Sequence, residues 1–138
     1  MNNHIYIESE KVFKKYEIEE NFKKINDKFR MAAVTGNRAI VYYNYGDWEN
    51  AITGQLDAAK IFESIKDTEG ICNTHNTIGN IFLKTGDTAR ATRYYRETIL
   101  LCGNRFKNIK ANAYSNIGII HLDHDRPDSA LFYFRKNL

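Results

Sequence analysis

Asparagine is the polar residue that recurs at regular intervals in this sequence. Asn73 and Asn112 lie 39 residues apart, and Asn37 and Asn116 lie 79 apart, which is one interval of 40 plus one of 39. An Asn amide offers both donors and an acceptor, so a row of Asn residues could pair with the backbone of an extended peptide. The alternative is that these are small polar residues on a solvated surface, because Asn is frequent elsewhere too, as at Asn104.

A second group that could do chemistry is the segment 121–125, His-Leu-Asp-His-Asp. His121 and His124 are one helical turn apart and Asp125 follows, a set that could ligate a metal ion. We expect no metal site, because His121 falls at a packing position of the repeat described below and the other residues lie in a turn. The sequence also shows no nucleophile elbow, no paired carboxylates on one face and no phosphate-binding glycine loop. We therefore expect a protein that is not an enzyme and needs no cofactor.

The composition fits one ordinary domain. Apolar residues make up 43% of the 138 and charged residues 27%, which provides a core and argues against disorder. The net charge of +3 is small, so we expect no nucleic-acid partner. Arg90, Arg93 and Arg96 are expected on a solvated face, with an acidic partner as the alternative. Cys72 and Cys102 are expected to be reduced, packed thiols. No N-terminal run is apolar enough for a signal peptide or a membrane span, so we expect a cytoplasmic protein without membrane contact.

Apolar residues spaced three and four apart predict about seven helices and no strands. Gly46-Asp47 and Gly86-Asp87 each combine a helix stop with a helix start, because Gly suits the left-handed position after a helix and Asp caps the next N-terminus. Pro127 fits the first turn of the last helix. The expected helices span 8–29, 32–45, 48–65, 71–84, 88–101, 108–123 and 127–138, with 66–70 as a turn.

The helices repeat in pairs with a period of about forty residues. Gly46-Asp47 and Gly86-Asp87 are 40 apart, and Asp125-Arg126 follows 39 later. Small residues where helices cross, next to large ones, are typical of helix packing, and hairpins of this kind bury their apolar faces by stacking. The same intervals relate three further sets: small residues at Ala39, Gly79 and Gly118, small residues at Ala51, Ala91 and Ala130, and large residues at Tyr42, Phe82 and His121.

At these positions the chain resembles the tetratricopeptide repeat family. The period is longer than the family's usual 34 residues and is similar to arrays in bacterial signalling regulators. The second hairpin carries the motif at Ile78-Gly79, Phe82, Gly86-Asp87, Ala91 and Tyr95, and the third at Tyr114, Ile117-Gly118, Pro127, Ala130 and Phe134. The first hairpin fits at Ala39, Tyr42, Gly46-Asp47, Ala51 and Ala58, and departs from the motif at Thr35, Arg38 and Gln55.

The resemblance implies an all-α fold, a right-handed solenoid of antiparallel helix hairpins, as a single domain over residues 1–138. Residues 8–29 would be an N-terminal helix or half repeat. Full repeats would follow at 32–70 and 71–107, and a repeat that is cut short at 108–138.

The resemblance also implies a concave groove that is lined by the first helix of each repeat and that binds a protein or peptide partner. The family's carboxylate clamp needs Lys or Arg at sites that here hold Gly36, Asn76 and Ser115, so we do not expect it. Leu83 would add an apolar side chain to the inner surface. The groove is expected to comprise Asn37, Tyr43, Asn44, Asn73, Asn76, Thr77, Asn80, Lys84, Asn112 and Asn116.

The C-terminal helix is strongly apolar and no polar capping helix follows it. Such a patch marks an interface, so Leu131, Phe132 and Phe134 are expected to meet another copy or a further repeat. The leading hypothesis is a non-catalytic protein- or peptide-binding module, in its narrower form the sensor or scaffold segment of a bacterial signalling protein. The alternative is a structural oligomerisation unit, a homodimer through the C-terminal helix, whose groove is empty.

Overall fold

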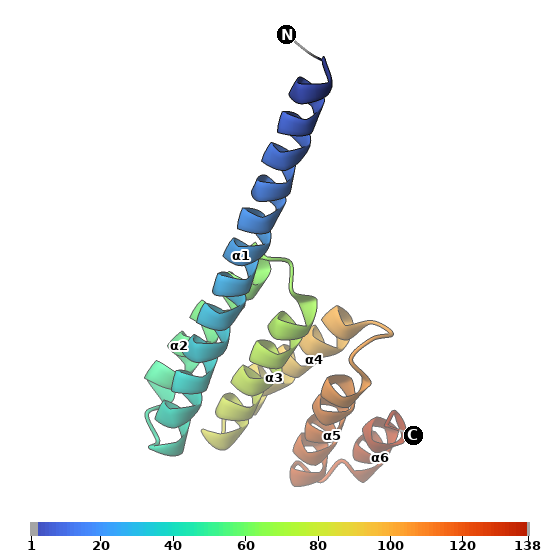
Figure 1. The fold of residues 1–138 in the computed structure, drawn as a ribbon. Coiled ribbons are helices and arrows are strands. Elements are labelled where there is room, and N and C mark those ends of the chain that lie inside the picture. The colour runs from blue at the N-terminus through green and yellow to red at the C-terminus, as the bar shows by residue number, and fades with distance from the viewer. Residues whose placement is uncertain (1–2, 138) are drawn as a thin grey trace.

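The structure is a computed structural model that describes residues 3–137, with the side chains of 11, 12 and 14–137. The described residues contain no strand, and their helices stack as successive antiparallel hairpins (Figure 1). The expected all-α solenoid of hairpins is therefore confirmed. The helices are α1 (Asn3–Asn44), α2 (Trp48–Ser64), α3 (Thr68–Lys84), α4 (Thr88–Cys102), α5 (Lys107–Asp123) and α6 (Pro127–Arg135).

Helix α1 corrects the expected helix count. The segments 8–29 and 32–45, expected as two helices, are one continuous helix of 42 residues, so the described chain has six helices rather than about seven. The junction Phe29–Ala32 contains no Gly, Pro or capping residue that would end a helix. In Figure 1 the N-terminal half of α1 projects well beyond α2, the helix against which its C-terminal half packs.

The turns between helices share one geometry. Asp47, Asp67 and Asp87 each accept a hydrogen bond from the backbone N–H three residues later, at 3.2, 3.1 and 3.0 Å. The backbone N–H and the guanidinium of Arg90 both hold the pKa of Asp87 below its ordinary value. The sequence prediction missed Asp67 and started α3 three residues late, because Lys66 takes the left-handed position that Gly occupies in the other two turns.

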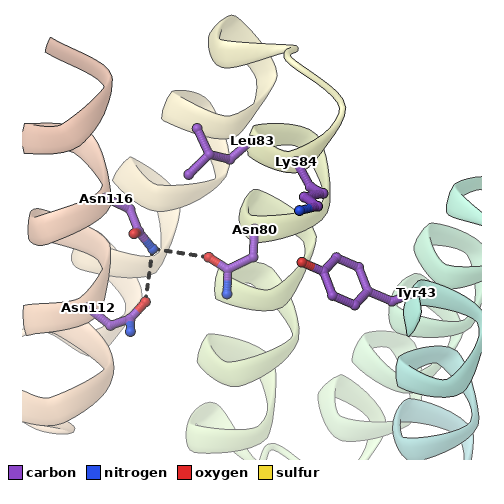
Figure 2. Close-up of a pocket in the computed structure, with 6 residues that line it drawn as sticks. All are labelled: Tyr43, Asn80, Leu83, Lys84, Asn112 and Asn116. Carbon is purple, nitrogen blue, oxygen red and sulfur yellow. Dashed lines mark hydrogen bonds between the residues drawn. The ribbon is translucent and has the colours of Figure 1, made fainter. Parts of the chain in front are cut away.

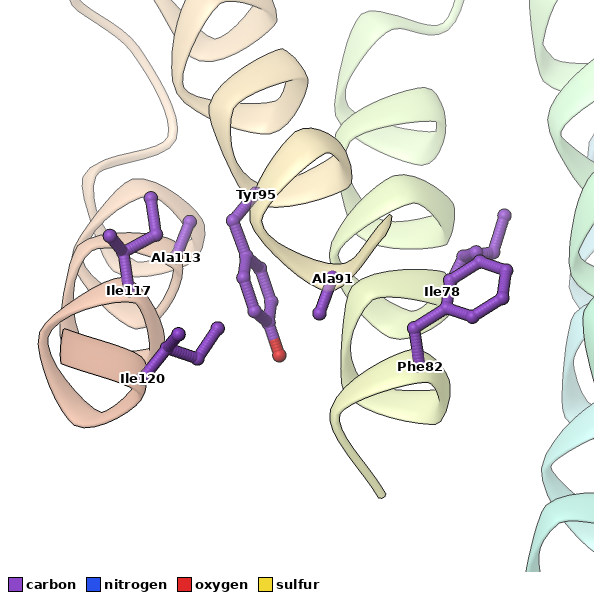
Figure 3. Close-up of a cluster of buried hydrophobic side chains, with 7 residues drawn as sticks. All are labelled: Ile78, Phe82, Ala91, Tyr95, Ala113, Ile117 and Ile120. Atoms are coloured by element: carbon purple, nitrogen blue, oxygen red, sulfur yellow. The ribbon is translucent and has the colours of Figure 1, made fainter. Parts of the chain in front are cut away.

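The expected packing of small residues against large ones is present in the second and third hairpins. A Cβ on Gly79 would lie 2.7 Å from the ring of Tyr95, and one on Gly118 would lie 2.6 Å from the ring of Phe134. Figure 3 shows Tyr95 projecting from α4 between Ala91 and the α5 residues of the core. The members of this buried cluster are Ile78, Phe82, Ala91, Tyr95, Ala113, Ile117 and Ile120.

The first hairpin solves the same packing problem differently. Gln55 stands 40 residues before Tyr95, and its buried side chain donates from Nε2 to the carbonyl of Gly36 at 3.0 Å. This bond satisfies a polar group inside the core, which would otherwise cost free energy. The departure from the family motif at Gln55 is therefore a replacement of a ring by a hydrogen bond.

Both cysteines lie in the core between α3 and α4. Cys72 and Cys102 are buried and carry free thiols. Burial, with the adjacent Cys102 thiol, raises the pKa of Cys72 to about 12, so this thiol stays protonated at neutral pH. Among the residues described, no helix is both long and apolar enough to cross a membrane.

Candidate binding groove

A pocket of about 470 Å³ lies where α1, α3 and α5 face one another (Figure 2). These helices are the first helices of the three expected repeats. Five of the ten expected groove residues line this pocket together with Leu83, so the spacing brought distant residues to one place. The lining residues are Tyr43 from α1, Asn80, Leu83 and Lys84 from α3, and Asn112 and Asn116 from α5.

The Asn side chains of α3 and α5 form a hydrogen-bonded network. The Asn116 Nδ2 donates to Oδ1 of Asn80 and to Oδ1 of Asn112, each at 3.0 Å. The Asn76 Nδ2 donates to the same Asn112 oxygen at 3.1 Å. Residues 36 positions apart in the sequence thus join two neighbouring repeats side chain to side chain.

Tyr95 anchors this network from the core beneath it. Its hydroxyl donates to Oδ1 of Asn80 at 2.7 Å, and its side chain is fully buried. Burial, and then the nearby Tyr43, raise the pKa of Tyr95, so its hydroxyl remains a proton donor at neutral pH. The sequence analysis placed Tyr95 only in the packing motif. The signal for a second role is the residue type itself, because a buried Tyr hydroxyl usually finds a polar partner.

The network fixes which end of each amide is free. The carbonyl oxygens of Asn80 and Asn112 each accept two hydrogen bonds from within the chain. Each oxygen offers two lone pairs, so both acceptors are filled. In Figure 2 the Nδ2 groups of Asn80 and Asn112 point away from these bonds, and the Lys84 ammonium lies nearby. The pocket therefore presents N–H donors and one positive charge.

The remaining expected groove residues lie outside the pocket lining. Asn37 and Asn44 are exposed on α1, and Asn73 is exposed on α3. Thr77 donates from Oγ1 to the carbonyl of Asn73 at 2.8 Å, a bond within its own helix. Asn76 contacts the network through Asn112 only. The inner surface therefore concentrates its ordered polar groups at the junction of α3 with α5.

The expected interface residues of the last helix divide into two kinds. Leu131 and Phe132 are exposed, with 46% and 55% of their surface accessible. Phe134 is half-buried over Gly118 and fills the position that Tyr95 fills in the preceding repeat. Only Leu131 and Phe132 therefore offer a free apolar surface in this part of the chain.

The histidines near the last turn lie in packing and capping contacts. His121 stacks on Tyr133 with ring centroids 5.1 Å apart, and burial lowers its pKa. The His124 Nδ1 lies 2.7 Å from the carbonyl of Ile120. Within residues 3–137, no three His, Cys, Asp or Glu side chains converge as metal ligands would.

Comparison with known proteins agrees with this geometry. No protein of curated function matches the sequence. The crystal structure of the TPR domain of Arabidopsis FLU superposes with a TM-score of 0.68 at 14% identity, covering 80% of this chain and 93% of that one. The crystal structure of MamA gives a TM-score of 0.43 at 16% identity, covering 77% and 75%. The tetratricopeptide repeat model matches residues 30–104, more than half of the chain. The chain therefore belongs to the tetratricopeptide repeat family.

Proposed function

We propose that this chain is a non-catalytic protein-interaction module that binds an extended peptide segment of its partner in the pocket between α1, α3 and α5. Proteins of this family generally mediate protein–protein interactions. The observation that carries the proposal is the set of outward N–H groups on Asn80 and Asn112, held in place because their oxygens are occupied within the chain. Donors that are fixed in advance lose little conformational entropy on binding.

The chemistry of the pocket matches a peptide backbone. Backbone carbonyls of an extended segment are acceptors that point outward on alternate sides, and the Asn80 and Asn112 amides supply donors for them. Leu83 and Tyr43 offer apolar surface for a side chain, and Lys84 favours an acidic neighbour. Amide groups neither take up nor release protons near neutral pH, so the lining suits binding rather than catalysis.

The wider setting that we propose is a cytoplasmic sensor or scaffold segment of a bacterial signalling protein, with no nucleic-acid partner. The support is the repeat period of about forty residues and the small net charge of +3. In this setting the domain captures a protein segment and contributes no chemistry of its own.

A donor-to-acceptor substitution tests the groove directly. Peptides that bind the chain would be selected from a library of random-sequence peptides. Asn112→Asp keeps the oxygen that accepts from Asn76 and Asn116 but replaces the outward Nδ2 with a second oxygen, so we expect it to abolish binding of the selected peptides. Asn108→Asp, an exposed position one turn away on α5, is the matched control and should bind normally. Equal binding by both variants would refute the groove proposal.

The competing candidate is a structural oligomerisation unit that associates through α6. The exposed Leu131 and Phe132 favour it. In that case the double variant Leu131→Ser/Phe132→Ser would dissociate the assembly in sedimentation experiments, whereas Asn112→Asp would leave it intact. Retention of the assembly in the α6 variant would exclude this candidate.

A further inference from the structure

An apolar stripe continues along α1 beyond the part that the rest of the chain covers. Ala32, Gly36 and Ala39 form its C-terminal part and pack against α2. The same helical face continues toward the N-terminus at spacings of four, three and four residues. These N-terminal members are Ile18, Phe22, Ile25 and Phe29, with 53, 62, 47 and 49% of their surfaces exposed.

This part of α1 lacks the packing that usually sustains a helix. Phe29 touches the end of α2 through an edge-to-face contact with Phe62, at 6.0 Å between ring centroids. Residues 11–28 are all exposed wherever their side chains are described, and Figure 1 shows this half of α1 projecting alone. Helices in water owe most of their stability to burial of an apolar face, so a partner for this face is expected.

The charges around the stripe are self-complementary. An acidic block, Glu17, Glu19 and Glu20, precedes Phe22, and a basic block, Lys23 and Lys24, follows it. Neither block takes part in an ion pair within the described part of the chain. A two-fold axis near Phe22 would place each acidic block beside the basic block of an antiparallel second copy. Isologous interfaces bring one patch against itself in this way.

We infer that the chain forms a homodimer in which the stripe Ile18–Phe29 of α1 packs against the same stripe of a second copy, antiparallel and crossing near Phe22. Phe22 of one copy then enters the hole bounded by Ile18 and Ile25 of the other, as a knob of one helix enters the groove of the next. This surface is separate from the groove and from α6.

The orientation follows from two constraints. A parallel pair in register would set acidic block beside acidic block, which is unfavourable. It would also run the second copy's α1 into the stripe at Ala32, Gly36 and Ala39 that α2 already covers. An antiparallel pair that crosses at about 50°, the commonest angle for packed helices, carries each N-terminal end to the side of the other copy's α2.

Charge reversal tests this dimer and identifies its occupant. The wild-type chain should show a concentration-dependent dimer in analytical ultracentrifugation. Glu19→Lys/Glu20→Lys and Lys23→Glu/Lys24→Glu should each weaken it by about tenfold or more, because attractive pairs become repulsive. The quadruple variant restores complementary blocks and should regain the dimer. An equimolar mixture of the two double variants should form the heterodimer.

Phe22→Ser separates apolar burial from charge. The side chain touches no other part of the described chain closely enough to support the fold, so circular dichroism and urea unfolding of the hairpins should be unchanged while the dimer is lost. A wild-type chain that stays monomeric at high concentration overturns the inference. So does a dimer that persists in both double variants, or one that is lost only when Leu131 and Phe132 are replaced. None of these outcomes depends on peptide binding, which Asn112→Asp tests.

Discussion

At the scale of single residues, the closest packing in the molecule surrounds the repeat glycines. Gly79→Ala would place a methyl group 2.7 Å from a ring carbon of the fully buried Tyr95. Overpacking of this kind costs about 1–3 kcal/mol, which outweighs the gain of about 1 kcal/mol from replacing a helical Gly by Ala. We expect a lower urea midpoint for Gly79→Ala.

Gly36→Ala is the matched control for that substitution. Its Cβ would lie 3.7 Å from the Ala58 Cβ, an ordinary contact, so the helix-propensity gain remains and stability should rise by up to about 1 kcal/mol. If both variants shift the midpoint in the same direction, the close approach of Tyr95 to α3 is not what selects Gly79.

Lys66 holds a backbone conformation that costs free energy for any side chain. Its φ is 57°, in the position where the equivalent turns have Gly46 at 78° and Gly86 at 83°. A left-handed L-residue costs roughly 1–2 kcal/mol, partly offset by the greater freedom of Gly in the unfolded chain. Lys66→Gly should therefore raise the melting temperature. Lys60→Gly, in the interior of α2, should lower it, since helical Gly is unfavourable by about 1 kcal/mol.

At the scale of elements, the two halves of α1 differ in what stabilises them. Asn21→Pro should break the N-terminal half, which no described residue covers, and reduce helical circular dichroism. The urea midpoint of the hairpins should stay unchanged at a concentration where the chain is monomeric. Asn73→Pro, inside α3, should cost about 3 kcal/mol or more. A similar loss for Asn21→Pro would show that the N-terminal half supports the hairpins.

The sequence predicted most elements because their boundaries carry chemical markers. Gly46-Asp47, Gly86-Asp87 and Pro127 marked turns that the structure contains. The start of α3 was misplaced because Lys66 replaces the marker Gly. Residues 29 and 32 were assigned to separate helices because apolar spacing alone does not show whether a helix continues. A helix with no breaking residue has no physical reason to stop.

The groove was predictable in position and not in orientation. The repeat period placed Asn80 and Asn116 on the inner side, where they lie. Which end of each amide faces outward depends on Tyr95, whose hydroxyl reaches Asn80 from the core, and on a bond between helices 36 residues apart. No local pattern encodes a contact of that kind. The same limit explains why Phe134 was expected at an interface and instead covers Gly118.

At the scale of the whole molecule, recognition and self-association use different surfaces. The pocket lies where α1, α3 and α5 meet, whereas the exposed stripe lies on the half of α1 that projects beyond the hairpins (Figure 1). A dimer through the stripe would leave both pockets open. Two linked pockets would bind a partner with two copies of a segment more tightly than one pocket alone, through effective concentration.

Nuclear magnetic resonance of the Asn side-chain amides tests the central claim most directly. The ¹⁵N-labelled chain would be titrated with a peptide selected from the random-sequence library. The claim predicts that the NH₂ signals of Asn80 and Asn112 shift on binding, that those of Asn104 and Asn108 do not, and that Lys84→Glu weakens binding whereas Lys60→Glu does not. Shifts confined to residues 11–29 of α1, or to Leu131 and Phe132, would contradict it.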